Sequence, residues 1–389
     1  MSVSPARWLY NDFKKVSVEQ RIPFNSSKGW DAKTRKKNRK KSKYSGRKYK
    51  RYRKGYWTQY KGQRKWKYAQ CIQQMKHLLD IKGDPYDVRP SGTVGRPPAR
   101  PEDIVIFIMI KELFCLSYLD TESFLAWICE EQSWLMKTVP DANTAQDHIK
   151  DIPLTYLAAL LQESISCLGE GELTVIIDAT GLSLNQYGQW IRVRNGKRKV
   201  KRKFVKVHLA VDKESNKILV GLSSKGWKHD HKFGVQLVKA LRRTCRRYDT
   251  TIEFELLDAG YLSRMMTDEI EKSNAKPYIK MKKNSTTKSR RSPSWKRNIR
   301  LQKDHPEEFM KVYCYRVVIE GIISAFKKVF GSMIASRKRH HQDVEVLCRL
   351  VLWNCMHWQR RNEFTGNTPG CPVFLIFSFH LPFYLPFYW

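Results

Sequence analysis

The chain has 389 residues, enough for two or three domains and at least one large core. Its 73 Lys and Arg against 37 Asp and Glu give a formal net charge of +36 at pH 7. A polyanion relieves the repulsion among so many cations, so nucleic acid is the leading partner and an anionic membrane surface the alternative. Nine cysteines without a Cys-x-x-Cys pair argue against a disulfide framework and a structural zinc site, and the N-terminus lacks the apolar core of a signal peptide.

Residues 1–67 are predicted to be a basic, largely disordered arm. From Lys28 to Lys67 nearly every second residue is Lys or Arg, Asp31 is the only acid, and Tyr and Trp are interleaved. Such a segment cannot bury enough apolar surface to fold alone. Its cations can contact phosphates and its rings can stack on bases, so we expect it to add affinity for DNA without a sequence code.

Residues 68–168 are predicted to form a helical N-terminal domain. A Pro- and Gly-rich linker covers residues 83–101. Thr144 is a plausible N-cap of the last helix. A bundle that binds DNA and a bundle that packs or dimerises are equally compatible with this pattern. The expected helices cover residues 68–79, 102–114, 121–130 and 144–149.

From Leu173 onward the pattern predicts a mixed α/β domain at residues 169–361, with helices covering a central sheet. Asn195-Gly196 is a strong turn signal, and we expect it to join the second and third strands as a hairpin. The expected strands are 174–178, 190–194, 204–211, 218–222, 252–258 and 277–281. The expected helices are 231–247, 264–272, 306–330 and 341–360.

Two aspartates follow apolar strands in similar segments, Val-Ile-Ile-Asp178-Ala-Thr-Gly and Glu-Leu-Leu-Asp258-Ala-Gly-Tyr. We expect each to emerge where its strand reaches a glycine-containing turn, and neighbouring strands would place the two carboxylates side by side. Such carboxylates repel each other unless a cation lies between them, and Mg²⁺ prefers oxygen ligands of this kind. Aspartates at strand ends also cap turns in ordinary proteins, so the pair alone is weak evidence.

A polar stripe on the expected helix at 306–330 adds a third acid. Tyr313, Arg316, Glu320 and Lys327 lie at offsets of three, seven and fourteen, which places them within an arc of about 60°. A merely exposed, salt-bridged face would give the same stripe. The opposing positions expected to supply core are Val317, Ile319, Ile322, Ile323 and Phe326.

The spacing Tyr-x2-Arg-x3-Glu-x6-Lys resembles the signature of prokaryotic insertion-sequence transposases of the DDE type, and every position is met. The Ile-Asp178-Ala-Thr and Leu-Asp258-Ala-Gly-Tyr segments resemble the two acidic motifs of that family. Lys203-Phe-Val-Lys-Val-His208-Leu resembles the strand that follows the first of them. The resemblance covers about residues 95–360 and is looser outside the four-residue signature.

This resemblance implies a ribonuclease-H-like catalytic core that cleaves the ends of a mobile element and joins them to target DNA. Asp178, Asp258 and Glu320 would hold Mg²⁺ or Mn²⁺, as two ions, and the protein would act on double-stranded DNA as a homodimer in the synaptic complex. No small-molecule substrate is expected, and the location would be the cytoplasm, at the nucleoid. Only a basic loop at 280–300 is expected between Asp258 and Glu320, so no large β insertion is expected there. The residues expected to grip the terminal nucleotides and phosphates are Tyr313, Arg316 and Lys327.

Further cations on the predicted hairpin are expected to contact DNA, because a β-ribbon fits the major groove. They are Arg192, Arg194, Lys197, Arg198, Lys199, Lys201, Arg202 and Lys203. The neighbouring run of His229, Asp230 and His231 is interpreted as a turn or helix cap rather than as metal ligands.

Residues 362–389 form an apolar, aromatic tail without a counterpart in that family. Its prolines make a poor helix and its length is marginal for a membrane span, so a frame disruption or read-through is favoured over an anchor. Three hypotheses remain: an active transposase, an inactive DNA-binding protein derived from one, and a basic membrane-associated protein. The three acids favour the first, and terminal inverted repeats in the flanking DNA would distinguish them best.

Overall fold

The structure is a computed structural model that describes residues 67–87, 98–165, 171–184, 190–194, 197–201, 203–288 and 291–357. For 190–194 and 197–201 only the backbone is described. The predicted basic arm, except Lys67, and the predicted apolar tail lie outside the described residues.

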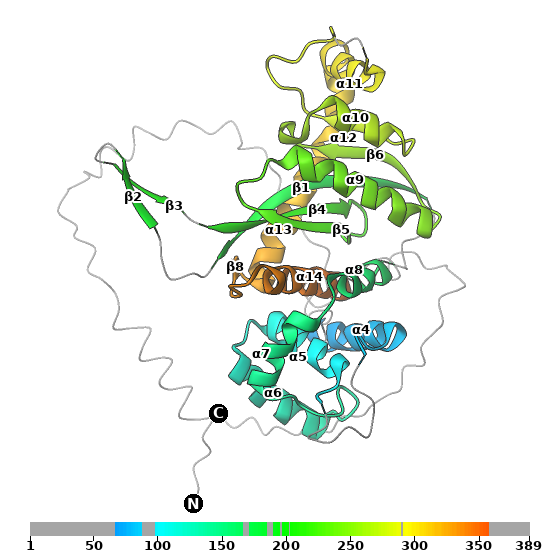
Figure 1. Cartoon of the computed structure of the whole chain (residues 1–389). Coiled ribbons are helices and arrows are strands. Elements are labelled where there is room, and N and C mark those ends of the chain that lie inside the picture. Colours follow the sequence, from blue (N-terminus) through cyan, green and yellow to red (C-terminus); the bar gives the residue numbers. More distant parts are fainter. Residues whose placement is uncertain are drawn as a thin grey trace, which may run out of the picture. The chain divides into compact units, whose positions relative to one another are not determined.

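A mixed sheet of six strands lies at the centre of the C-terminal half of the described chain (Figure 1). Its order is β5-β4-β1-β6-β7, and the short β8 pairs with the end of β1. Strand β4 runs antiparallel to both of its neighbours, β1 and β5. Strands β6 and β8 are parallel to β1, and β7 is parallel to β6. The strands are β1 (Glu172–Leu184), β4 (Phe204–Asp212), β5 (Ile218–Lys225), β6 (Thr251–Leu257), β7 (Lys276–Ile279) and β8 (Met333–Ile334).

Helices cover both faces of this sheet, because side chains along each strand alternate between two apolar cores. In β1, Val175 and Ile177 belong to the core under α9 (Asp230–Arg247) and α10 (Arg264–Glu271). Ile176 belongs to the core on the other face, with α13 (Val317–Phe330) and α14 (Arg339–Met356). The expected fold class, a mixed sheet flanked by helices, is confirmed.

The N-terminal helices share the second of these cores. Helix α14 packs against α4, α5 and α8 and also against β5. No helix in the described part of the chain is long and apolar enough to cross a membrane. The helices of this segment are α4 (Lys67–Lys82), α5 (Pro101–Phe114), α6 (Tyr118–Glu131), α7 (Ala142–His148) and α8 (Leu154–Glu163). The division into a helical domain at 68–168 and a catalytic domain at 169–361 stays a prediction.

Two strand predictions are corrected by the sheet. Strand β1 does not end at Asp178 but continues to Leu184, because β4 pairs with it as far as Ser183. The hairpin through Asn195-Gly196 joins β2 (Trp190–Arg194) to β3 (Lys197–Lys201) and not to the strand at 204–211. A two-residue turn selects the residues that immediately follow it, and the apolar 204–211 run is buried beside β1 instead.

The loop expected at 280–300 contains the start of a helix, α11 (Pro293–Asp304). The Ser292 side chain accepts a hydrogen bond from the Trp295 N–H, and proline stands in the first turn. This Ser-Pro start is a helix signal that the sequence prediction missed. Similarly, the N-cap of α7 is Asp141 rather than Thr144, because its carboxylate accepts the Thr144 N–H at 2.8 Å.

The helix expected at 306–330 is not continuous. It consists of α12 (Pro306–Tyr313), a 3-10 turn at Cys314–Arg316, and α13. Val317, expected in the core, is 65% exposed, because at about 100° per residue it lies about 160° around α13 from the buried Ile319. Ile319, Ile322 and Phe326 are buried as expected, and Ile323 packs partly buried against them.

Candidate active site

Three carboxylates from distant parts of the chain come together beyond the end of β6. The predicted pairing of the two aspartate strands is confirmed, since Ile177 in β1 is the register partner of Leu257 in β6. The next residues, Asp178 and Asp258, therefore lie at the same height on adjacent strands. Glu320 comes from α13, which covers this face of the sheet.

The guanidinium of Arg316 contacts all three acids. Its Nη2 lies 3.0 Å from Asp178 Oδ2 and 4.0 Å from Asp258 Oδ1. Its Nη1 lies 3.0 Å from Glu320 Oε1, one helical turn further along. A cation thus stands where the mutual repulsion of the carboxylates requires one.

The donors fit a hard divalent cation by their chemistry, because all of them are carboxylate oxygens. Their present arrangement, however, is built around the Arg316 guanidinium. Within the described ranges no group of three or more His, Cys, Asp or Glu side chains is arranged to hold a metal ion. An ion placed between all three of these oxygens would take the position of the guanidinium.

The environment of Asp178 favours a bound cation. Burial raises its pKa above the ordinary value, and the negative charges of Asp258 and Glu320 add to this effect. The Ala179 N–H, which donates to Asp178 Oδ1 at 2.8 Å, and the positive charge of Arg316 both lower this pKa. An additional positive charge at this place would therefore favour the ionised form.

The other two signature residues differ in their exposure. The ring of Tyr313 is buried and stacks on Phe309 with centroids 5.0 Å apart. Burial, together with the negative charges of the three acids, raises the pKa of Tyr313 to about 12, while Arg316 opposes this rise. Its hydroxyl has no hydrogen-bond partner among the described residues. Lys327 is half-buried on α13, two turns after Glu320. The predicted contacts of Tyr313 and Lys327 with DNA stay predictions.

The hairpin cations are only partly placed. Arg192 and Arg194 lie in β2, opposite Lys199 and Lys197 of β3. Lys201 ends β3, and its side chain, like those of the other hairpin cations, is not described. Arg202 lies outside the described residues, whereas Lys203 is exposed. Their contacts with DNA also stay predictions.

A polar cluster that sequence analysis missed lies on the opposite face of the sheet, under α9. It consists of Lys206, His208, Ser224, Asp230 and Tyr261. His208 is fully buried, with Nδ1 3.2 Å from the Tyr261 hydroxyl and Nε2 3.0 Å from Ser224 Oγ. Lys206 Nζ donates to Asp230 Oδ1 at 2.8 Å. Polar residues at alternate positions of the apolar β4 run were the available signal.

This cluster supports the turn that carries Asp258. The 3-10 turn Ala259–Tyr261 follows Asp258 directly, and its last residue is the buried Tyr261 held by His208. The prediction that His229 to His231 form a turn or cap is confirmed, because His229 is the N-cap of α9 and Asp230 begins the helix.

The burial of His208 predicts how stability depends on pH. Burial lowers its pKa from 6.5 to about 4, so the unfolded chain takes up a proton at a higher pH than the folded one. Folding stability therefore rises with pH between about 4 and 6.5, and this residue accounts for about 3 kcal/mol of that rise. Thermal melts at pH 4.5, 5.5 and 7 should show a shallower pH dependence for His208→Gln. An identical slope would contradict a neutral, buried His208.

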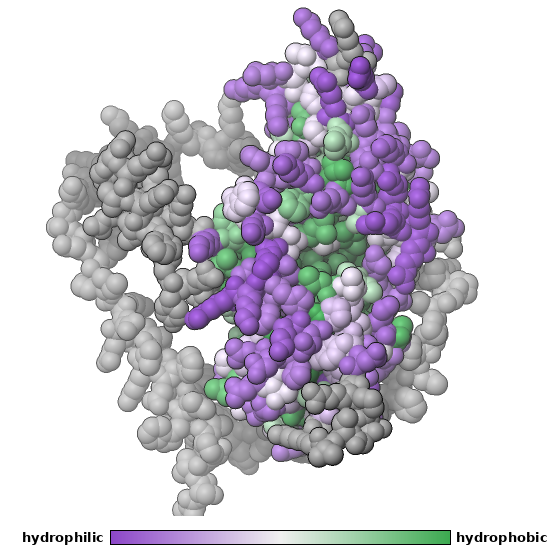
Figure 2. Space-filling view, in the orientation of Figure 1, coloured by the Kyte–Doolittle hydropathy of each residue, from purple (hydrophilic) through white to green (hydrophobic). Residues whose placement is uncertain are grey.

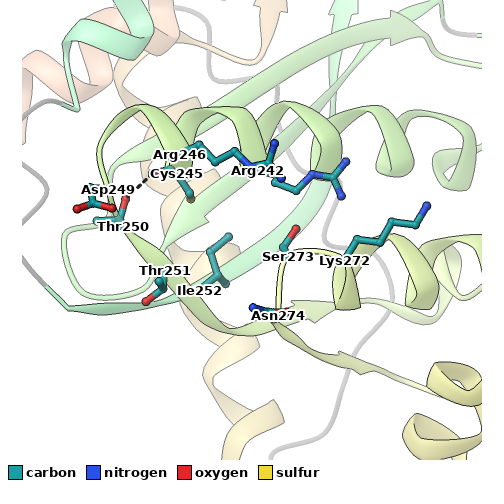
Figure 3. Close-up of a pocket in the computed structure, with 10 residues that line it drawn as sticks. All are labelled: Arg242, Cys245, Arg246, Asp249, Thr250, Thr251, Ile252, Lys272, Ser273 and Asn274. Carbon is teal, nitrogen blue, oxygen red and sulfur yellow. Dashed lines mark hydrogen bonds between the residues drawn. The ribbon is translucent and has the colours of Figure 1, made fainter.

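A cavity of about 270 Å³ lies at the other end of β6, where the strand begins (Figure 3). Figure 3 shows Arg242 and Arg246 of α9, with Lys272 after α10, around it. Glu269 neutralises two of these cations, with contacts of 2.7 Å to Arg242 and 3.1 Å to Lys272. The cavity lies at the start of β6 and the candidate active site lies beyond its end, so the two places are separate.

Residues 169–355 match the family model of the transposase DDE domain. A solved piggyBac transposase synaptic complex with hairpin DNA is 13% identical, with a TM-score of 0.36 over 75% of this chain and 70% of that one. A Mos1 transposase paired-end complex with the left transposon end is 12% identical, with a TM-score of 0.21 over 59% and 82%. A Mos1 mariner paired-end complex with Mn is 14% identical, with a TM-score of 0.21 over 67% and 86%. None of the curated proteins matches.

Residues 169–355 therefore match a transposase DDE domain, and the predicted resemblance to DDE transposases is confirmed. The domain spans all three carboxylates and Arg316.

Proposed function

We propose that this protein is a DNA transposase that cleaves DNA at the ends of a mobile element and joins the freed ends to target DNA. One observation carries the proposal. Asp178, Asp258 and Glu320 come from two adjacent strands and a facing helix, and all three contact one guanidinium inside a transposase DDE domain.

The three carboxylates would hold Mg²⁺ or Mn²⁺, and a pair of ions would stabilise the attacking and leaving oxygens at the phosphate. In the first step a water oxygen attacks a strand phosphorus, and the bond to the 3′ oxygen breaks to leave a 3′-hydroxyl. In the second step that hydroxyl attacks a target phosphorus and displaces a target 3′-hydroxyl. Neither step requires a nucleophilic side chain, so the residues of the site need only position the reacting groups.

Double-stranded DNA is the proposed partner, both as element ends and as target, with a homodimer as the synaptic form. The charge of +36 supports a polyanionic partner. Arg316, released from the carboxylates, and Lys327, on the helix that follows Arg316, are the proposed cations that hold the scissile strand against the negative acids.

Arg316→Ala and Lys327→Ala should impair cleavage far more than binding. Each removes one charge from a chain of very high charge, so affinity for DNA should change less than about fivefold. Loss of a positioning contact should slow cleavage about a hundredfold. The measurement is Mn²⁺-dependent nicking of the terminal repeats found in the flanking DNA, with binding measured in parallel.

Lys328→Ala is the matched control, because Lys328 is the exposed next residue on α13 and is outside the signature. It should nick normally. Wild-type cleavage that persists with a chelator, or normal cleavage by both signature variants, would overturn the proposed roles.

A further inference from the structure

Trp227 has the largest exposed fraction, 73%, among the exposed large hydrophobic side chains of the described residues. It lies in the turn between β5 and α9, and Lys228 Nζ lies 4.8 Å from its ring centroid. Single exposed apolar residues are common on protein surfaces. Trp227 differs from such residues because its turn is fixed to the sheet and lies near the candidate active site.

The turn is fixed to the sheet by its backbone. The Gly226 N–H donates to the Phe204 carbonyl at 3.1 Å, and Lys206 Nζ donates to the Lys228 carbonyl at 3.3 Å. A Cβ on Gly226 would lie 2.7 Å from the Phe204 oxygen, so only glycine allows this close approach. The indole of Trp227 is therefore presented from a rigid base.

The same turn lies beside the candidate active site. Lys206, which holds the turn, also binds Asp230 at 2.8 Å. Asp230 Oδ2 and Asp258 Oδ2 lie 3.7 and 3.9 Å from the point where a Cβ on Gly260 would stand. Both carboxylates thus lie within 4 Å of the same point, so the turn held by Lys206 and Asp230 lies near Asp258.

We propose that Trp227 is a base-stacking residue, which receives an unpaired base of DNA next to the scissile phosphate. An aromatic ring stacks on any base, and Lys225 and Lys228, on either side of Trp227 in the sequence, carry charges suited to the adjacent phosphates. These cations favour DNA over an apolar protein surface as the occupant. The inference rests on the proposed function, because it takes DNA as the substrate of the site.

The test compares two duplexes, one fully paired and one with an unpaired 2-aminopurine at a single-stranded end. Wild type should quench the unpaired fluorophore and bind its duplex more tightly than the paired one. Trp227→Ala should lose about 5- to 100-fold of that preference, the usual range for one stacked base. Trp227→Phe should restore part of it, which a purely structural role would not explain.

Trp134→Ala is the matched control, since Trp134 is also exposed and belongs to the helical N-terminal segment. It should keep both the quenching and the preference. Unchanged quenching by Trp227→Ala would overturn the proposal, as would a variant that alters only the oligomeric state in light scattering. Metal-dependent nicking by wild type is scored separately, so failure of the stacking role and failure of the proposed function are distinguishable.

Discussion

The Asp258→Asn variant is expected to nick element ends about a thousandfold more slowly than wild type and to bind DNA nearly as well. The amide keeps the shape of the carboxylate but loses the charge that would hold a divalent ion. That ion contributes several kcal/mol to the transition state, which corresponds to this loss of rate. The side chain is 47% exposed and its contact with Arg316 is 4.0 Å, so stability should change little. Mn²⁺-dependent nicking, gel-shift affinity and a thermal melt measure the three quantities.

Asp249→Asn provides a matched control for this variant. Asp249 is an exposed acid just before β6, at the end of the strand opposite to Asp258. Its φ of 47° is one that asparagine tolerates well. Normal nicking by Asp249→Asn together with lost nicking by Asp258→Asn supports the site, whereas normal nicking by both removes Asp258 from it.

The second large effect concerns stability and a buried ion network between α5 and α14. Arg349 Nε lies 2.7 Å from Glu112 Oε2, and its Nη2 lies 2.6 Å from Glu345 Oε1. Nη1 donates to the Met333 carbonyl of β8 at 2.9 Å, and Lys111 pairs with Glu112 at 2.8 Å. Both Glu112 and Glu345 are buried, so neither could be solvated if the arginine were lost.

Arg349→Met should therefore destabilise the protein by about 3–5 kcal/mol, because two buried carboxylates lose their main partner. For a domain of this size the melting temperature should fall by about 10 °C. Burial already raises the pKa of Glu345. Protonation would relieve the uncompensated charge, so the loss should be smaller at pH 5 than at pH 8.

Arg339→Met on the same helix is the control, because its pair with Asp343 at 2.7 Å is partly exposed and worth at most about 1 kcal/mol. Adding Glu345→Gln to Arg349→Met should recover part of the loss, since it removes the carboxylate whose ion pair is lost, whereas Glu112 keeps its pair with Lys111. Equal melting temperatures for the two arginine variants would contradict a structural role for the buried network.

Local patterns in the sequence predicted many of the elements and the candidate acids. The apolar runs before Asp178 and Asp258 predicted two strands, and the register of Ile177 with Leu257 places them side by side. The spacing of Arg316 and Glu320 predicted one helix face, and the two side chains do meet at 3.0 Å. These predictions succeed because strand alternation and helical periodicity depend on residues close in the chain.

Only the tertiary structure decided which distant groups meet. Strand β1 runs past Asp178 because β4 pairs with it, and no local pattern gives the length of a partner strand. The contact of Arg316 with Asp178 joins residues 138 positions apart, and that of His208 with Tyr261 joins residues 53 apart. Such contacts depend on how the sheet and helices pack, because a side chain's neighbours across a sheet are set by register and not by its place in the chain.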